Sequence, residues 1–167
     1  MTPDNPDTML HQLFAKIGPH LKLDTYFNFM VHDEGNALKL ASCIGIDDET
    51  ARGIERLEFG QAVCGTVAML RKALTASFIQ ESKDSKVQLV KSFGIRAYAC
   101  NPLLAGDQLL GTLSFASRTR DEFSAEELDF LQTICQYVTA AYERLRLIGK
   151  LREADRAQGR VFGKPGA

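Results

Sequence analysis

The chain has 167 residues, of which 45% are hydrophobic and 25% charged, and its formal net charge is −1. This length and composition fit one globular domain with its own core, and the near-neutral charge argues against a nucleic-acid binder that relies on overall positive potential. No apolar run approaches the roughly 20 residues that a membrane-spanning helix needs. The polar, acidic start MTPDNPD is unlike a secretion signal, so we expect a cytoplasmic protein without a membrane partner.

The cysteines are spread along the chain without a CxxC pair. This spacing argues against a zinc site or a close redox pair, and a disulfide scaffold is not expected at this chain length. We therefore interpret the cysteines as small buried hydrophobic residues. They are Cys43, Cys64, Cys100 and Cys135.

The first part of the chain predicts an arm, a helix and a hairpin. Residues 1–7 hold two prolines and two aspartates, which favours a flexible arm. Residues 8–23 place apolar side chains at helical spacing, and Pro19 predicts that this helix ends or breaks nearby. Segments 25–31 and 37–46 are apolar and flank an Asp-Glu-Gly-Asn turn, so they predict two paired strands.

The middle of the chain predicts short elements that cover a sheet. Residues 47–57 are polar and permit a short helix or a covering loop, with Ile54 and Leu57 on the inward side. The spacing of apolar side chains then predicts a helix over 60–72, a strand over 74–79 and a helix over 82–92.

The last part predicts a long hairpin followed by a long helix. Two alternating apolar segments within 95–117 flank a short turn that contains Gly and Asp, which is the pattern of a β-hairpin. Ser124 and Glu127 form a capping box at the start of a strongly amphipathic helix. After Leu151 the chain becomes polar and predicts a frayed tail.

These elements predict an α+β domain with three layers. The short links between strands favour a mainly antiparallel sheet. The two terminal helices are expected on one face of this sheet and the central helical segments on the other.

The order of these elements resembles the GAF domain family. Three segments carry the resemblance: FGQAVCGTVA at 59–68, YACNPLL running into LGTLSF at 98–115, and Phe123-Ser124 with the acidic turn that follows. The resemblance implies a three-layer α/β/α sandwich that senses a small molecule, as in phosphodiesterases, phytochromes and bacterial sensor kinases. It divides the chain into a flexible arm at 1–7, a sensory domain at 8–147, and a helix continuation and tail at 148–167.

The resemblance also implies a pocket between the sheet and the central helices. Sequence alternation leaves open which face of the sheet lines this pocket. Only Tyr98 and Asn101 offer polar groups to a ligand, and the aromatic candidates can equally be core residues. The identity of a ligand or cofactor stays unknown. The candidates are Phe29, Phe59, Val63, Cys64, Phe78, Phe93, Tyr98 and Asn101.

One branch of the family reduces free methionine sulfoxide with cysteine thiols, and its Gly-Val-Cys-Gly segment resembles Ala62-Val63-Cys64-Gly65. That branch places its nucleophilic cysteine before the long hairpin, where residues 80–94 of this chain hold none. Cys100 lies inside a predicted strand, which is a poor place for a reactive thiol. We therefore expect no catalytic residues and keep this enzyme as an alternative.

Cofactor chemistry finds little support in the sequence. No cysteine has the neighbours that covalent bilin attachment requires, and the dispersed signature of cyclic-nucleotide binding is not found. Non-covalent haem would have to use His11, His20 or His32, and isolated histidines are more often surface residues. Walker, HExxH and Gly-x-Ser-x-Gly motifs are absent from the sequence, and no metal site is expected.

The final helix predicts a homodimer. By resemblance, the terminal helices pair across a two-fold axis and continue into a kinase or another output domain. The predicted seam is Val138, Tyr142, Leu145 and Ile148. A sensory binding module is the favoured function, and a structural dimerisation domain with a filled core is the second.

Overall fold

The computed structural model describes residues 5–162 and shows one antiparallel sheet. Its six strands lie in the order β3-β2-β1-β6-β5-β4, and each strand pairs antiparallel with its neighbours. The predicted α+β class with a mainly antiparallel sheet is therefore confirmed. The strands are β1 (Thr25–His32), β2 (Ala37–Ile44), β3 (Arg56–Glu58), β4 (Leu74–Ala76), β5 (Ala97–Ala105) and β6 (Gln108–Ser117).

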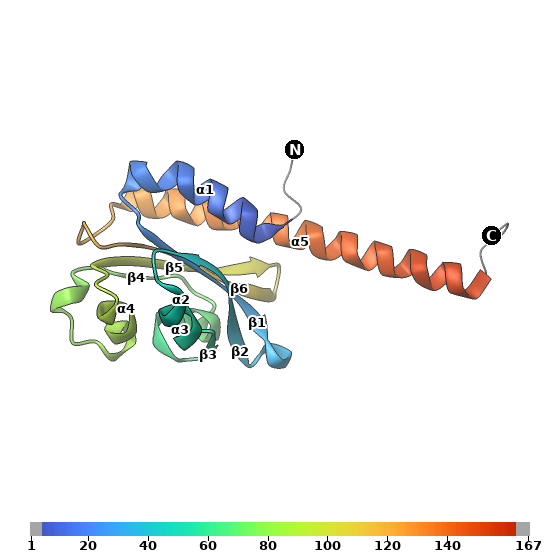
Figure 1. Ribbon diagram of the computed structural model, residues 1–167, viewed down its shortest axis with the longest axis horizontal. Coiled ribbons are helices and arrows are strands. Elements are labelled where there is room, and N and C mark those ends of the chain that lie inside the picture. Colours follow the sequence, from blue (N-terminus) through green and yellow to red (C-terminus); the bar gives the residue numbers. More distant parts are fainter. Residues whose placement is uncertain (1–4, 163–167) are drawn as a thin grey trace.

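Helices cover both faces of the sheet and complete the three-layer sandwich (Figure 1). The helices α1 (Pro6–Leu21) and α5 (Ala125–Phe162) lie antiparallel on one face, and α5 extends well beyond the sheet. The opposite face carries α2 (Asp48–Gly53), α3 (Ala62–Leu70) and α4 (Gln88–Ser92). Three single 3-10 turns complete the fold: η1 (Asp33–Gly35), η2 (Ile79–Glu81) and η3 (Ser85–Val87).

Side-chain alternation along the strands separates two apolar clusters. On β1, Phe27 and Phe29 pack with the central helices, whereas Tyr26 packs with the terminal helices. On β5, Tyr98 points to the first cluster and Ala99 to the second. The face of the sheet that lies beneath the central helices is here called the α3 face. The face toward α1 and α5 is called the α5 face.

The first helix begins two residues earlier than the sequence predicts and ends close to Pro19, as expected. It begins at Pro6, inside the segment expected to be a flexible arm, because the Asn5 side chain accepts a hydrogen bond from the Asp7 N–H at 2.8 Å. Proline at the first helical position has no N–H that needs a partner. Pro19 lies within the helix, which ends at Leu21 where Lys22 adopts a left-handed conformation.

The sequence analysis also missed or misplaced other elements. It did not predict β3, whose three residues pair with the outer edge of β2. The predicted helix over 82–92 is divided into η3 and α4, and β4 ends at Ala76. The expected frayed tail is helical as far as Phe162, because residues 151–158 are mostly good helix formers. Residues 163–167 of that tail lie outside the described residues.

The long hairpin and the capping box are confirmed. β5 and β6 pair from Ala97↔Ser117 to Ala105↔Gln108, with the turn at the predicted place. The Ser124 hydroxyl accepts from the Glu127 N–H at 3.2 Å, and the Glu127 carboxylate accepts from the Ser124 N–H at 2.8 Å. Gly111 in β6 allows close strand approach, since a Cβ there would lie 2.1 Å from the Phe29 carbonyl oxygen.

Candidate functional site

A small apolar cavity lies between the α3 face of the sheet and the three central helices. Its void is only about 10 Å³, roughly the space that one water molecule needs. The cavity is therefore almost filled by its own side chains. It is lined by Phe27, Phe29, Ile54, Leu57, Ala62, Val63, Cys64, Leu89, Val90, Phe93 and Tyr98.

Of the pocket candidates named from the sequence, the structure brings Phe29, Val63, Cys64, Phe93 and Tyr98 together in this cavity. Several lining residues were not among those candidates. Phe27 shares the alternation of Phe29 on β1, so that signal was present in the sequence. Ile54 and Leu57 had been placed on the inward side of their segment.

Three candidates do not line the cavity. Cys100 points to the α3 face, and successive side chains on a strand alternate between faces, so Asn101 points to the α5 face. Phe78 has a left-handed backbone and is 46% exposed near Arg120. Phe59 packs at the edge of the α3-face cluster and lines a separate surface groove beside β6.

The polar part of the cavity wall, Cys64 and Tyr98, belongs to a chain of thiols and hydroxyls that continues behind the wall to Cys100 and Ser114. The Cys64 Sγ lies 2.9 Å from the Tyr98 hydroxyl, which donates to the Ser114 Oγ at 2.7 Å. Ser114 in turn donates to the Phe27 carbonyl at 3.4 Å, and the Cys100 thiol donates to the Cys64 Sγ at 3.8 Å. All of these side chains are buried in the protein interior.

This environment shifts the pKa values of the two thiols in opposite directions. Hydrogen bonds from Cys100, Tyr98 and Ser114 lower the pKa of Cys64 despite its burial. Burial raises the pKa of Cys100 well above its ordinary value, and its hydrogen bond to Cys64 acts in the same direction. The Cys64 thiol is thus the more acidic member of the pair.

The segment over the cavity, residues 79–95, is held largely by its own hydrogen bonds. Gln80 donates to the carbonyls of Lys91 and Ile95, and the Lys91 ammonium donates to the Ser82 carbonyl. Bonds that stay within one segment allow it to move as a unit. We call residues 79–95 the cover.

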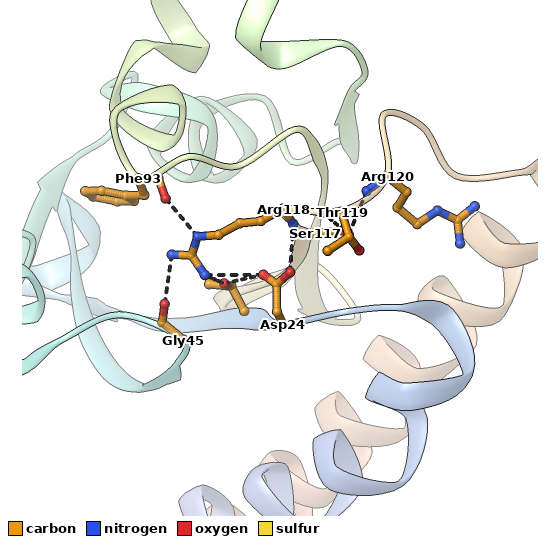
Figure 2. Close-up of polar contacts among 8 residues, drawn as sticks. Asp24, Gly45, Phe93, Ser117, Arg118, Thr119 and Arg120 are labelled. Atoms are coloured by element: carbon orange, nitrogen blue, oxygen red, sulfur yellow. Dashed lines mark hydrogen bonds and ion pairs between the residues drawn. The ribbon is translucent and has the colours of Figure 1, made fainter.

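The cover is joined to the sheet by Arg118, at the end of β6 (Figure 2). Its guanidinium donates to the Phe93 carbonyl at the end of α4 and to the Gly45 carbonyl after β2, each at 2.8 Å. It also contacts Asp24, whose carboxylate accepts from the Arg118 N–H. One side chain therefore links the cover, the end of β2 and the start of β1.

The residues after Arg118 continue this linkage into α5. The Asp121 carbonyl accepts from the Phe78 N–H, and the Asp121 carboxylate forms a bidentate ion pair with Arg96. Arg120 forms a second bidentate ion pair with Glu127 in the first turn of α5. Its two guanidinium nitrogens lie 2.6 and 2.5 Å from the two carboxylate oxygens. Residues 117–124 thus contact the cover through Arg118, the two residues that flank the cover through Asp121, and the long helix through Arg120.

Helix α5 presents two apolar stripes on different sides. The inner stripe faces the sheet and consists of Leu131, Cys135, Val138 and Tyr142. The outer stripe lies about a quarter turn around the helix, with spacings of three and four residues except between Ala141 and Ile148, and its Ile134 also packs against the α5-face cluster. It consists of Phe130, Ile134, Tyr137, Ala141, Ile148 and Leu151, of which Phe130, Tyr137 and Leu151 are exposed.

The structure places the residues of the predicted dimer seam on two sides of α5. Val138 is fully buried against the sheet of its own chain, and the Tyr142 hydroxyl donates to the Asn28 side chain. These residues belong to the inner stripe, as Leu145 does by its spacing, and only Ile148 lies on the outer stripe. The sequence pattern contained both stripes, and it could not show which one meets the sheet.

Metal and membrane sites find no support within residues 5–162. No group of three His, Cys, Asp or Glu side chains there could hold a metal ion, and none of the histidines proposed for haem lines the cavity. None of the helices in this part of the chain combines the length and apolar character that crossing a membrane requires.

Comparison with protein families decides the assignment of the fold. The family model described as the GAF domain matches residues 5–142. This chain belongs to the GAF domain family. No curated protein sequence matches it.

Solved GAF structures superpose on most of the chain. The GAF domain of a phosphoenolpyruvate-protein phosphotransferase from Coxiella burnetii has a TM-score of 0.73 at 19% identity, covering 89% of both chains. A domain of a two-component sensor histidine kinase protein from Sinorhizobium meliloti 1021 gives 0.68 at 14%, covering 87% of this chain and 95% of that one.

An enzyme also shares this GAF fold. The free methionine-R-sulfoxide reductase from Neisseria meningitidis, solved with its substrate, has a TM-score of 0.71 at 17% identity, covering 87% of this chain and 83% of its own. Likeness at these identities establishes the fold alone. The activity must be argued from the residues of this chain.

Proposed function

We propose that this GAF domain is a non-catalytic sensory module that couples a ligand in the cavity to helix α5. One observation carries this proposal: the cover and the first turn of α5 are both bonded to the same short connection, residues 117–124. Any displacement of the cover acts on that connection. A change at the cavity can therefore reach the helix without crossing the sheet.

The lining defines the class of ligand. Aromatic and aliphatic side chains form most of the wall, and the Tyr98 hydroxyl with the Cys64 thiol forms its polar part. This composition suits a small, mainly apolar molecule with one hydrogen-bonding group. Because the void holds about one water, such a ligand requires the cover to move outward.

The output in this proposal is a pair of α5 helices from two copies of the chain. Residues 151–158 are exposed along their whole length in a single chain. Isolated helical segments of that kind are marginally stable in water, and most helical stability comes from packing. The outer stripe offers a coiled-coil seam that continues from beside the sheet into this exposed part. Paired helices would carry the signal to a downstream output domain.

The sensing step is tested by native mass spectrometry of the protein purified from its source organism. We expect a bound small molecule that leaves on mild activation, and greater loss of that molecule from Arg118→Ala, which releases the cover. Arg52→Ala, on the exposed side of α2, is the control and should retain the ligand. A protein without bound molecule that no small-molecule panel stabilises would favour the structural dimerisation function instead.

The pairing step is tested by sedimentation velocity over a concentration series. Tyr137→Glu and Leu151→Glu place charge on the outer stripe and should shift the dimer to monomer. Gln132→Glu, also exposed on α5 but off that stripe, should leave the dimer intact. A wild-type chain that stays monomeric at high concentration would remove the pairing step.

The enzymatic alternative has its own test. The cover contains no cysteine, and the thiol in contact with Cys64 is Cys100 on a central strand. We therefore expect no turnover of free methionine sulfoxide in the presence of a thiol reductant. Turnover that is lost in Cys64→Ser would overturn the non-catalytic assignment.

A further inference from the structure

We infer that Cys64 and Cys100 form a redox-modification site, at which a small hydroperoxide oxidises the two thiols to a reversible disulfide. The inference concerns the chemistry of the cavity wall and does not depend on the proposed sensory function. It rests on the arrangement of the two sulfurs, on the hydroxyls around them and on the void beside Cys64.

The two sulfur atoms are already in contact. Cys64 on α3 and Cys100 on β5 bring their Sγ atoms to 3.8 Å, across the junction between helix and sheet. A disulfide needs a sulfur separation of about 2.05 Å, so the two sulfurs must approach each other by less than 2 Å.

The hydroxyls around Cys64 can stabilise its thiolate. In the neutral state each group donates one hydrogen bond to the next. Cys100 donates to Cys64, Cys64 to Tyr98, Tyr98 to Ser114, and Ser114 to the Phe27 carbonyl. When Cys64 loses its proton, the Tyr98 hydroxyl can turn its hydrogen toward the sulfur, and Cys100 continues to donate. The Thr112 hydroxyl, buried without a hydrogen-bond partner, lies near enough to lower the pKa of both thiols.

An oxidant has a place beside the more acidic thiol. Cys64 lines the cavity, whose void of about 10 Å³ suits a molecule near the size of water. Hydrogen peroxide has two oxygen atoms where water has one, so it is among the smallest oxidants and needs only a small widening of this void. Larger oxidants, such as glutathione disulfide, would have to displace the cover.

The reaction balances in two steps. The Cys64 thiolate attacks one peroxide oxygen, the O–O bond breaks, and the products are Cys64 sulfenic acid and hydroxide. The Cys100 sulfur then attacks the sulfenic sulfur, the S–O bond breaks, and the Cys100 proton leaves with that oxygen as water. In total, two thiols and one hydrogen peroxide give one disulfide and two waters, and a dithiol reductant reverses the product.

Peptide mapping of the full chain tests the inference directly. Each cysteine lies in a different tryptic peptide: 40–52, 57–71, 97–118 and 121–144. After treatment with hydrogen peroxide and alkylation of the remaining thiols under denaturing conditions, we expect peptides 57–71 and 97–118 to be linked, and the link to disappear with dithiothreitol. Cys43→Ser, which removes the half-exposed thiol, is the control and should give the same link.

Variants establish the order of the two steps. In Cys100→Ala the first step has no second thiol, so Cys64 should accumulate as sulfenic acid and be captured by dimedone. In Cys64→Ala, Cys100 should stay unlabelled. Tyr98→Phe should slow disulfide formation by about tenfold, because it removes one hydrogen bond to a charged sulfur.

The inference is overturned if Cys64 and Cys100 are both alkylated under conditions that fully oxidise Cys43, or if the recovered link joins any other pair. Circular dichroism of each variant shows whether it folds. Since the wild-type map needs no variant, loss of folding in Cys100→Ala leaves the main result intact.

Discussion

At the scale of single residues, the close approach of α3 to the chain before it depends on Gly65. A Cβ at this position would lie 2.3 Å from the Glu58 carbonyl oxygen, a contact that only a backbone shift can relieve. We expect Gly65→Ala to lower the free energy of unfolding by about 1–3 kcal/mol in urea denaturation. Gly53→Ala meets no atom within 4 Å and should change stability by less than about 1 kcal/mol. Equal effects of the two substitutions would contradict this account.

A second residue-scale prediction concerns acid stability. The hydrogen bonds from Arg120 lower the pKa of Glu127 to about 2, below its ordinary value of 4.5. A depressed carboxyl pKa contributes stability above pH 4.5, which is lost as the pH falls toward 2. We expect Glu127→Gln to lower the Tm by about 2–4 °C at pH 7, and the difference from wild type to vanish near pH 2. A difference that persists at pH 2 would contradict the ion pair as its cause, since Gln also serves in the capping box.

At the scale of elements, Arg118 adds side-chain hydrogen bonds between the cover and the sheet to the packing of Ile79, Val87, Val90 and Ile95 in the α3-face cluster. Arg118→Ala removes the hydrogen bonds to the Phe93 and Gly45 carbonyls together, while the bonds inside the cover remain. We expect amide hydrogen exchange in residues 79–95 to become about tenfold faster, with little change in β1 and β6. Arg52→Ala should leave the exchange rates as in wild type. Uniform acceleration across the domain would indicate global destabilisation and contradict a local tether.

The elements were predictable where local chemistry decides them. The Gly-Asp turn and the alternation on either side define the long hairpin, and Ser124 with Glu127 defines the start of α5. β3 has three residues and is stabilised by its pairing with β2, so its own sequence carries little strand signal. Pro19 likewise indicated where the first helix finishes, since α1 ends at Leu21, two residues later.

The candidate site was predictable only in part, since the resemblance identifies the segments but not the direction of each side chain. Tyr98 and Asn101 looked equivalent as polar pocket groups, and strand alternation places them on opposite faces. Phe78 points outward because its residue adopts a left-handed backbone, which no local pattern signals. The contact between Cys64 and Cys100 joins a helix to a strand and depends on tertiary packing.

At the scale of the whole molecule, the sandwich and the exposed half of α5 should behave as separable parts. Residues 151–158 are exposed in a single chain and so add little to its core. A chain ending at Lys150 should keep its Tm within about 2 °C, measured at a concentration where both chains are monomeric, and should dimerise about tenfold more weakly, because it lacks Leu151. A truncated chain with unchanged dimer affinity would place the contact elsewhere.

The offset between the two stripes of α5 has a consequence for any domain that follows it. The inner stripe packs on the sheet and the outer stripe is partly exposed, yet both belong to one continuous helix of 38 residues. Each added residue turns the helix by about 100°, so the rotational phase of an attached reporter is set by residue count. Inserting seven residues after Gln158 returns the helix to about the same phase and should preserve the response of such a reporter, whereas inserting two or five turns it by about 200° or 140° and should invert or abolish the response. The response of the reporter would then vary with the number of inserted residues, with the period of the helix.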